Sequence, residues 1–448
     1  MDTANKKVGS VCPHPTLKLL WRTSMKICPS TTRVAAALLL ILPISVPLTM
    51  AADWPQFRGP NQDGISTEKM EVWPAAGPKL LWKVPNFSGW GSFAVSGDKA
   101  YTLISRESGG VNSEVCIALD AATGKELWAA QVAPVAKYST VTDTHSDDKG
   151  GYGPGSTPVV NDGKIYVYSY DMKLCCFDAQ TGKDLWRVDV LKDHDGMLPW
   201  YGSYVSPVVE GDEVIVAGGG PGQFVLGFNK NTGQVVWKTE TAINQNSTPL
   251  VSTIHGVRQV IFYLKNDLFG ISLQDHKTLW RSAVAQHNGH AAMQPIVLGD
   301  KVYVGSFTEG SAVYQVRKEE DGFYSKRLWF NGSKDTGWLG TPVLQDGYLY
   351  TTVDWYRTGY ACIEFATGKV IWRKSGVTKG SPILVGDKLL FLTENGGLIL
   401  VEPKPEYKEL ARFDKAIAGK SFSAPAFSNG RLYIRTHKEG ACYDLSAK

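Results

Sequence analysis

Short apolar runs separated by turn residues recur along the chain after residue 52. The clearest repeat begins with Asp, Asn or Glu and reaches Trp eight positions later, with Thr-Gly in between. It spans 120–128, 178–186, 229–237 and 364–372, and weaker copies end at Trp280, Trp329 and Ala411. Thr-Gly between two apolar runs is typical of a hairpin, because Gly adopts a positive φ at no steric cost. Helical periodicity is absent, so the pattern predicts antiparallel strands.

A second signature lies between the Trp motifs: a small residue, Pro, an apolar run, a turn, and a strand that carries Tyr. One copy spans 157–167, and a copy without Pro precedes it at 94–101. Further copies carry Pro207, Pro249, Pro295, Pro342, Pro382 and Pro425. The spacings from Pro158 onward are 49, 42, 46, 47, 40 and 43 residues. Eight copies with about four short strands each predict an all-β fold, an eight-bladed β-propeller of four-stranded antiparallel blades.

The two ends of the repeat array predict how the ring closes. The last repeat ends at 444–445 without a Trp strand after it, whereas an unassigned Trp strand stands at 79–84. We therefore expect 79–84 to complete the C-terminal blade, with Trp82 in the slot of the other motif tryptophans. Strict alternation places Leu81 and Lys83 on one face, and Leu80, Trp82 and Val84 on the other. The predicted organisation is a leader at 1–52, an N-terminal strap at 53–78 and the propeller at 79–446.

The leader reads as a secretory signal. Arg33 precedes an apolar run at 34–50, and the small residues Ala51 and Ala52 follow it. This order of a basic, an apolar and a small-residue region is typical of a cleaved signal peptide. We expect a periplasmic or secreted protein without a transmembrane domain in its mature form. The alternative is a membrane anchor formed by 34–50, and Met25 is a second candidate for the true start.

Charge excludes one class of partner. Residues 1–52 hold six basic side chains and one acid, so without them the formal charge changes from +4 to −1. A near-neutral folded part gives no electrostatic reason to bind nucleic acid.

Five cysteines follow the leader: Cys116, Cys175, Cys176, Cys362 and Cys442. Three of them occupy one repeat position, two residues before the Asp of the Trp motif, where other copies have Ala or Gly. A small buried side chain is the expected requirement there, and Cys175 should point to the opposite face from Cys176. A vicinal Cys175–Cys176 disulfide is the alternative. The haem-attachment motif Cys-x-x-Cys-His is absent, which excludes a c-type haem.

The Thr-Gly-Lys…Trp motif, the Ser/Thr-Pro strand and the eightfold count resemble the pyrroloquinoline-quinone (PQQ) repeat propellers. The opening Trp54-Pro55-Gln56-Phe57-Arg58-Gly59 also looks like that of secreted, mostly uncharacterised members of this family. The resemblance covers nearly the whole chain after the leader and is specific for fold. Its enzymatic members imply a Ca²⁺ held by a carboxylate and an amide, a Trp under the quinone, an Asp base and Arg contacts. It does not imply activity, because one fold carries many functions.

Candidate binding residues are those that enter each innermost strand, because these segments line one mouth of the central channel. Blade by blade they are Trp90, Tyr152, Trp200, Tyr201, Asn246, His287, His290, Trp338, Lys379 and Phe422. Arg and acidic residues are missing from this set, so it does not match the quinone and Ca²⁺ constellation, and we predict no metal site. An aromatic-lined pocket for a flat or sugar-like ligand is one interpretation. The other is that the aromatics only fill the channel, and the pair His287 and His290 lacks a clear third metal ligand.

Two functions stay open. We favour a non-catalytic binding or scaffold module of the cell envelope, a monomer that holds a protein, glycan or small-molecule ligand on its loop face. The polar insertion at 142–154 is a candidate for such a role, because long loops often carry function, and the alternative is a solvated loop that binds nothing. The alternative is a PQQ-dependent oxidoreductase with Ca²⁺ that acts on an alcohol or a sugar.

Overall fold

The chain separates into residues 1–49 and residues 50–448, and the description below concerns the second unit. This computed structural model describes residues 53–85, 87–108, 110–134, 153–199, 202–284, 292–306, 310–332, 340–353, 358–378 and 380–447. Among these residues no helix is long and apolar enough to cross a membrane.

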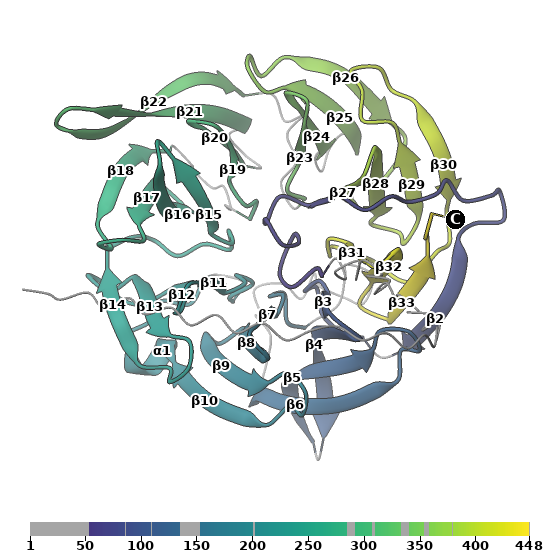
Figure 1. The fold of residues 1–448 in the computed structure, drawn as a ribbon, viewed down its shortest axis with the longest axis horizontal. Helices are drawn as coiled ribbons and strands as arrows, with labels where there is room; N and C mark the ends of the chain where they lie inside the picture. Colours follow the sequence, from purple (N-terminus) through teal and green to yellow (C-terminus); the bar gives the residue numbers. More distant parts are fainter. Residues whose placement is uncertain are drawn as a thin grey trace, which may run out of the picture. The chain divides into compact units, whose positions relative to one another are not determined.

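Eight blades of four antiparallel strands stand around a common centre, and β1 adds a parallel fifth strand to one of them, which confirms the predicted eight-bladed β-propeller (Figure 1). Blade 1 consists of β3 (Ala94–Ser96), β4 (Lys99–Ser108), β5 (Val111–Asp120) and β6 (Glu126–Pro134). Blade 2 consists of β7 (Val159–Asn161), β8 (Lys164–Tyr168), β9 (Lys173–Asp178) and β10 (Asp184–Asp189). Blade 3 consists of β11 (Val208–Glu210), β12 (Glu213–Ala217), β13 (Val225–Asn229) and β14 (Val235–Thr239). Blade 4 consists of β15 (Leu250–Ile254), β16 (Val257–Tyr263), β17 (Asp267–Ser272) and β18 (Thr278–Ala283). Blade 5 consists of β19 (Ile296–Leu298), β20 (Lys301–Ser306), β21 (Gly310–Glu319) and β22 (Gly322–Asn331). Blade 6 consists of β23 (Val343–Gln345), β24 (Tyr348–Val353), β25 (Gly359–Glu364) and β26 (Val370–Ser375). Blade 7 consists of β27 (Gly380–Val385), β28 (Lys388–Thr393), β29 (Leu398–Val401) and β30 (Glu409–Phe413). Blade 8 consists of β31 (Ala426–Ser428), β32 (Arg431–Arg435), β33 (Glu439–Asp444) and β2 (Lys79–Pro85). The remaining elements are β1 (Ile65–Ser66) and the short helix α1 (Val190–Asp193).

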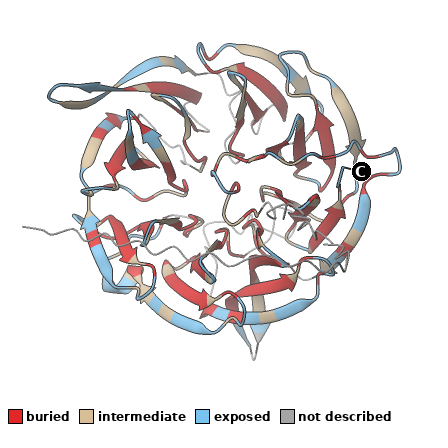
Figure 2. Cartoon of the chain, in the orientation of Figure 1, coloured by how far each residue is buried: buried red, intermediate tan, exposed pale blue. Residues whose placement is uncertain are grey.

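The two middle strands of each blade carry the core, while the outermost strands face solvent (Figure 2). In blade 2, Cys176 pairs with Tyr166 on one side and with Trp186 on the other. Two large rings therefore flank one position, and only a small side chain fits between them. The equivalent residues Ala118, Cys362 and Cys442 sit between a Tyr and a Trp in the same way. The predicted packing role of this position is confirmed.

The Trp motif joins neighbouring blades. The indole nitrogen of Trp128 donates to the main-chain oxygen of Ala179 in blade 2 (3.2 Å). The same ring lies on the Thr-Gly turn of that blade, where a Cβ on Gly182 would come within 2.6 Å of it. Gly182 has a φ of +71°, so this turn needs glycine for its conformation and for the close ring. The repeat thus encodes the junction between blades as well as a hairpin.

Blades 3 and 4 depart from this rule. Ile215, rather than Tyr, pairs with Gly227, and the indole of Trp237 donates to Glu213 of its own blade (2.7 Å). In blade 4, His276 occupies the turn position of the glycine and its ring stacks on Trp237 at 4.6 Å. Its Nε2 lies 3.1 Å from the Glu213 carboxylate. The junction of blades 3 and 4 therefore rests on contacts that differ from those of the repeat.

The Ser or Thr that precedes most of the repeat prolines also has a structural role. The hydroxyl of Thr157 accepts a hydrogen bond from the main-chain nitrogen of Ser92 in the preceding segment (2.9 Å). The main-chain nitrogen of Thr157 donates in turn to the Ser206 hydroxyl (2.9 Å), and the main-chain nitrogen of Ser206 donates to the Thr248 hydroxyl (3.1 Å). These bonds link the segments that lead into the innermost strands of blades 1 to 4. The proline nitrogen has no hydrogen to donate, whereas the hydroxyl of the residue before it can accept a hydrogen bond.

The ring closes as predicted: β2 pairs antiparallel with β33, about 360 residues away along the chain. Trp82 is opposite Cys442 and only 5% exposed, which is the motif slot of blade 8. The prediction for the face of Leu80 and Leu81 was wrong. The register shifts between Leu80 and Trp82, so Leu80 is 46% exposed, whereas Leu81 packs against the core beside Trp82 and Val84. A bulge adds one residue to the strand and interrupts the alternation that the prediction assumed.

Residues 53–66 form a strap that reaches the centre of the ring (Figure 1). Trp54 pairs with Val95 of blade 1, and the oxygen of Pro55 accepts from Val160 of blade 2. Farther along, Gln62 accepts from Val251 of blade 4 (3.1 Å), and Ile65 pairs in parallel with Leu384 of blade 7. The strap therefore connects the innermost strands of blades that are distant in sequence.

Arg58 is the buried centre of the strap. Its guanidinium donates to the main-chain oxygens of Thr341 (2.8 Å) and Pro342 (2.7 Å) in blade 6 and of Asp63 (2.6 Å) in the strap. Burial lowers the pKa of Arg58 to about 10, since the charged form has lost its water. The Trp-Pro-Gln-Phe-Arg-Gly opening is thus a structural insert in the ring.

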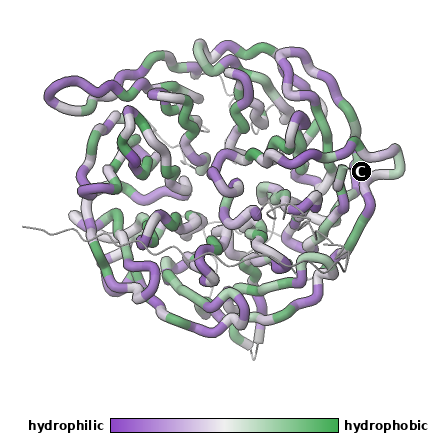
Figure 3. The backbone as a smooth tube through the Cα atoms, in the orientation of Figure 1, coloured by the Kyte–Doolittle hydropathy of each residue, from purple (hydrophilic) through white to green (hydrophobic). Residues whose placement is uncertain are grey.

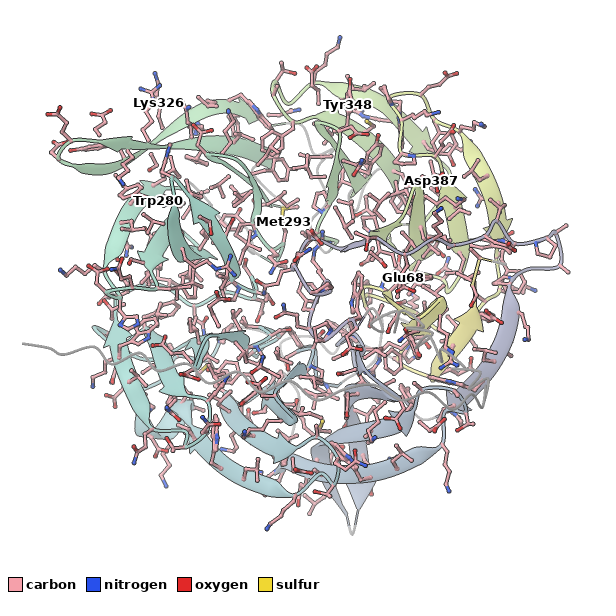
Figure 4. All side chains as sticks on the ribbon, in the orientation of Figure 1. Glu68, Trp280, Met293, Lys326, Tyr348 and Asp387 are labelled. Carbon is pink, nitrogen blue, oxygen red and sulfur yellow. The ribbon has the colours of Figure 1, made fainter. Side chains whose placement is uncertain are left out.

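After β1 the chain runs outward over blade 8 toward β2. The carboxylate of Glu68, marked in Figure 4, accepts from the main-chain nitrogens of Asn429 (3.1 Å) and Gly430 (2.8 Å) in the β31–β32 turn. At the opposite side of the ring, the β21–β22 hairpin extends beyond the rim with a hydrophilic tip (Figure 3).

Candidate functional site

An aromatic cluster lies where segments that enter the innermost strands meet. The ring of Trp90 stacks on Tyr204 with centroids 5.4 Å apart and lies 5.3 Å from Phe422. Tyr204 contacts Tyr170 edge to face at 6.1 Å. Trp90, Tyr204 and Phe422 are each partly exposed, and below they are called, together with Tyr170, the mouth cluster. The segments entering blades 8, 1 and 3 meet here.

Asn246 supports this cluster from the segment that enters blade 4. Its side-chain oxygen accepts a hydrogen bond from the main-chain nitrogen of Tyr204 (2.9 Å). The main chain of Trp90 is held in the same manner, by donation to Pro154 (2.7 Å) and by acceptance from the Ser423 hydroxyl (2.8 Å). The rings are therefore fixed by main-chain contacts between blades.

Three of the predicted site residues belong to the described part of the chain: Trp90, Asn246 and Phe422. The structure brings Trp90 and Phe422 together and places Asn246 on Tyr204. Their role in binding stays a prediction. The others fall outside the described residues: Tyr152, Trp200, Tyr201, His287, His290, Trp338 and Lys379.

Sequence reasoning missed Tyr204, although a signal was available. Tyr204, Asn246 and Phe422 each precede the repeat proline by three positions. At the same position blade 2 has Gly155, and a Cβ there would lie 1.9 Å from the Tyr204 ring. Because Gly155 has no side chain, the segment that enters blade 2 leaves room for the Tyr204 ring of blade 3.

The strap contacts the innermost strands themselves, whereas Trp90, Tyr204 and Phe422 lie in the segments before them. Trp54 pairs with Val95, five residues beyond Trp90, and Gln62 contacts Val251, five residues beyond Asn246. The strap therefore meets these two blades farther along the chain than the mouth cluster does.

A buried acid lies beneath this mouth. Glu114 of β5 is 0% exposed, and its Oε2 accepts from the main-chain nitrogen of Tyr170 (3.0 Å). Its Oε1 has no hydrogen-bond partner among the described residues. Burial raises the pKa of Glu114 to about 8, with a further increase from the nearby Asp171. This carboxyl is therefore uncharged at neutral pH.

The described mouth residues Trp90, Tyr204, Asn246 and Phe422 offer aromatic rings and an amide, but no carboxylate or arginine for a quinone and Ca²⁺ site. The described part of the chain contains no group of three or more His, Cys, Asp or Glu side chains that could hold a metal ion. The two buried arginines among the described residues are engaged elsewhere, since Arg58 binds strap and blade 6 carbonyls and Arg435 binds Thr102, Leu103 and Phe87. No reaction step through such a cofactor follows from this arrangement.

The cysteines match the packing interpretation. Cys116, Cys175, Cys176, Cys362 and Cys442 are all free and buried. Cys175 packs between blades 1 and 2, whereas Cys176 packs toward blade 3, so the two adjacent thiols face opposite ways. Burial raises the pKa of each to about 12, which keeps both thiols protonated and unreactive.

Two of the relatives found by comparison with known proteins differ in kind. One is the dehydrogenase subunit of a quinone-type alcohol dehydrogenase of Komagataeibacter europaeus, 32% identical over 145 residues, which are 30% of this chain and 18% of that protein. The other is outer membrane protein assembly factor BamB of Burkholderia pseudomallei, 22% identical over 262 residues, 56% of this chain and 64% of that protein. The matches therefore span less than two thirds of either relative.

Solved structures agree on the fold. BamB from Moraxella catarrhalis aligns with a TM-score of 0.57 at 14% identity, over 82% of this chain and 98% of that one. Quinohemoprotein alcohol dehydrogenase from Comamonas testosteroni aligns with a TM-score of 0.62 at 13% identity, over 89% and 81%. The sequence profile described as outer membrane protein assembly factor BamB matches residues 111–374, more than half of the chain. The protein therefore belongs to this family of PQQ-repeat β-propellers.

Proposed function

We propose that this protein is a non-catalytic binding or scaffold propeller of the cell envelope, whose contact surface is the mouth cluster and the loops around it. The observation that carries the proposal is the cluster of partly exposed Trp90, Tyr204 and Phe422, where the segments that enter three blades meet. Aromatic side chains dominate binding energy at interfaces, and rigid ones lose little entropy.

The chemistry of the mouth defines the ligand class. Its described side chains are aromatic or amide, and the acid beneath them is neutral. Such a surface suits an apolar protein segment or a sugar ring and offers little to a strongly charged ligand. The family match, with a profile and relatives described as outer membrane protein assembly factors, supports a protein partner. Export by the segment 34–50 and a monomeric state belong to the same proposal.

Replacing Trp90 with alanine should weaken binding of an envelope partner at least about tenfold, the loss of roughly 1.4 kcal/mol expected for an interface anchor. The measurement is the affinity of the purified variant for the component that the parent retains from an envelope extract. Phe330→Ala is the matched control, because Phe330 is an exposed aromatic residue on the rim strand β22. Equal loss in both variants, or no loss in Trp90→Ala, would contradict the assignment of the mouth.

A PQQ-dependent oxidoreductase is the second candidate, since a quinone-type alcohol dehydrogenase subunit is among the relatives. The described residues do not supply its ligands, so we expect no saturable uptake of PQQ in the presence of Ca²⁺. Absorbance of the quinone and dye reduction with a panel of alcohols and sugars test this. Stoichiometric uptake with substrate-dependent dye reduction would replace the scaffold proposal.

A further inference from the structure

Two lysines lie beside the mouth cluster on its blade 8 side. Lys420 comes two residues before Phe422 in the segment that enters blade 8, and Lys438 belongs to the turn between β32 and β33. The two main chains meet where the nitrogen of His437 donates to the oxygen of Lys420 (3.2 Å). The side chain of Lys438 crosses Gly419, where a Cβ would lie 3.2 Å from its Cγ. Both lysine side chains therefore start from adjoining positions at the edge of the mouth cluster.

Neither of these ammonium groups has a carboxylate partner among the described residues, and both side chains reach solvent. The acids of the neighbouring turns are engaged elsewhere. Glu439 pairs with Lys83 (3.7 Å), and Asp414 pairs with Arg412 (3.7 Å). Glu394 of the blade 7 turn has an interaction of its own. The two lysines are therefore available to an anionic group of a ligand.

The blade 2 side of the mouth cluster carries the opposite charge. Asp171 follows Tyr170, whose ring contacts Tyr204, and its side chain is partly exposed. The cation of the same turn, Lys173, is paired with Asp189 (2.5 Å). A ligand that is acidic along its whole length would therefore meet an acid over blade 2, whereas one anionic group over blade 8 would meet two lysines. The charges thus select one end of the ligand as the anionic end.

We propose that the mouth binds an apolar segment of a partner protein that carries a carboxylate at one end, with this carboxylate between Lys420 and Lys438 and the apolar part on the aromatic rings. The inference rests on the proposed function, because it names the chemistry of the partner for the same site. An anionic membrane surface fits less well. Lipid-binding clusters hold about four to eight basic residues, and Asp171 opposes a uniformly negative surface.

Two fluorescent dyes with one aromatic skeleton measure the charge preference on the purified full chain. Anilinonaphthalene sulfonate carries an anion, and N-phenyl-naphthylamine is its neutral counterpart. Trp90→Ala should weaken the binding of both dyes. The double variant Lys420→Gln with Lys438→Gln should weaken the sulfonate roughly three- to tenfold, as expected for two partly exposed ion pairs, and leave the neutral dye unchanged. Lys326→Gln is the matched control and should change neither affinity, because Lys326 is an exposed lysine on the rim strand β22.

Peptides then test the carboxylate itself. The peptide acetyl-Phe-Leu-Phe-Asp-amide should displace the sulfonate dye from the parent at a several-fold lower concentration than acetyl-Phe-Leu-Phe-Asn-amide. The double lysine variant should remove this difference. Salt at about 1 M should also reduce it, since the screening length is then only about 3 Å. The peptide and salt comparisons need only the parent protein, so they decide the matter even if the double variant fails to fold.

The outcomes separate this inference from the proposed function. If the double lysine variant binds the sulfonate as tightly as the parent, or if the two peptides compete equally, the charge preference is wrong. The mouth assignment then stands as long as Trp90→Ala weakens both dyes. Unchanged binding of both dyes in Trp90→Ala would contradict the proposed function itself. Lysine-dependent sedimentation with phosphatidylglycerol vesicles, without a difference between the peptides, would replace the partner segment with a membrane surface.

Discussion

Replacing Trp82 with alanine is expected to lower the free energy of unfolding by about 3–5 kcal/mol, the usual cost of deleting a buried indole. Trp82 is 5% exposed, donates to the oxygen of Ala121 in blade 1 (3.1 Å) and packs against Phe93 and Tyr433. It therefore holds the last blade to the first. A loss of this size is a large share of a typical domain's stability. Chemical denaturation with tryptophan fluorescence measures it.

Trp372→Ala is the matched control, since Trp372 fills the same slot in blade 6 but is partly exposed and lies in a continuous stretch of repeats. It should cost less than Trp82→Ala. Truncation gives a second test: removing residues through 85 deletes β2 and should cause aggregation or a much lower melting temperature, whereas trimming to residue 52 should be harmless. Equal melting temperatures for the two truncations would refute the role of β2 in closure.

Replacing Arg435 with leucine is expected to lower the free energy of unfolding by at least about 3 kcal/mol. The Arg435 guanidinium is fully buried between blades 8 and 1, and it donates to the hydroxyl of Thr102 and the main-chain oxygens of Leu103 and Phe87. Leucine would leave these acceptors buried without a donor, at about 1–3 kcal/mol each. The gain from no longer burying an unpaired cation offsets only part of this loss. Thermal and chemical unfolding of the variant measure the effect.

Arg435→Lys separates charge from geometry. Lysine keeps the cation but cannot place donors on three acceptors in the planar arrangement of arginine, so an intermediate loss is expected. Arg412→Met is the control, because Arg412 is held at the surface by Glu409 (2.7 Å), and such ion pairs contribute about 1 kcal/mol or less. If Arg435→Leu costs no more than Arg412→Met, Arg435 is not a closure contact.

Much of the fold could be predicted from the sequence because propeller repeats are local. Each Thr-Gly hairpin and each Ser/Thr-Pro strand lies within one blade, so motifs a few residues long were enough to count eight blades and to find that β2 completes the last one. The requirement for a small residue at Cys176 could also be predicted, because the same position is Ala, Gly or Cys in six repeats.

Only the tertiary structure decided the contacts that join distant segments. Arg58 meets Thr341 and Glu114 meets Tyr170 across blade boundaries, and no repeat or spacing encodes such pairs. The bulge at Leu80 likewise reverses a face that alternation alone predicts. A periodic sequence determines which strands form and how they stack, since those choices depend on neighbours along the chain. The strap, the neutral acid and the mouth cluster depend instead on which side chains the closed ring brings together and removes from water.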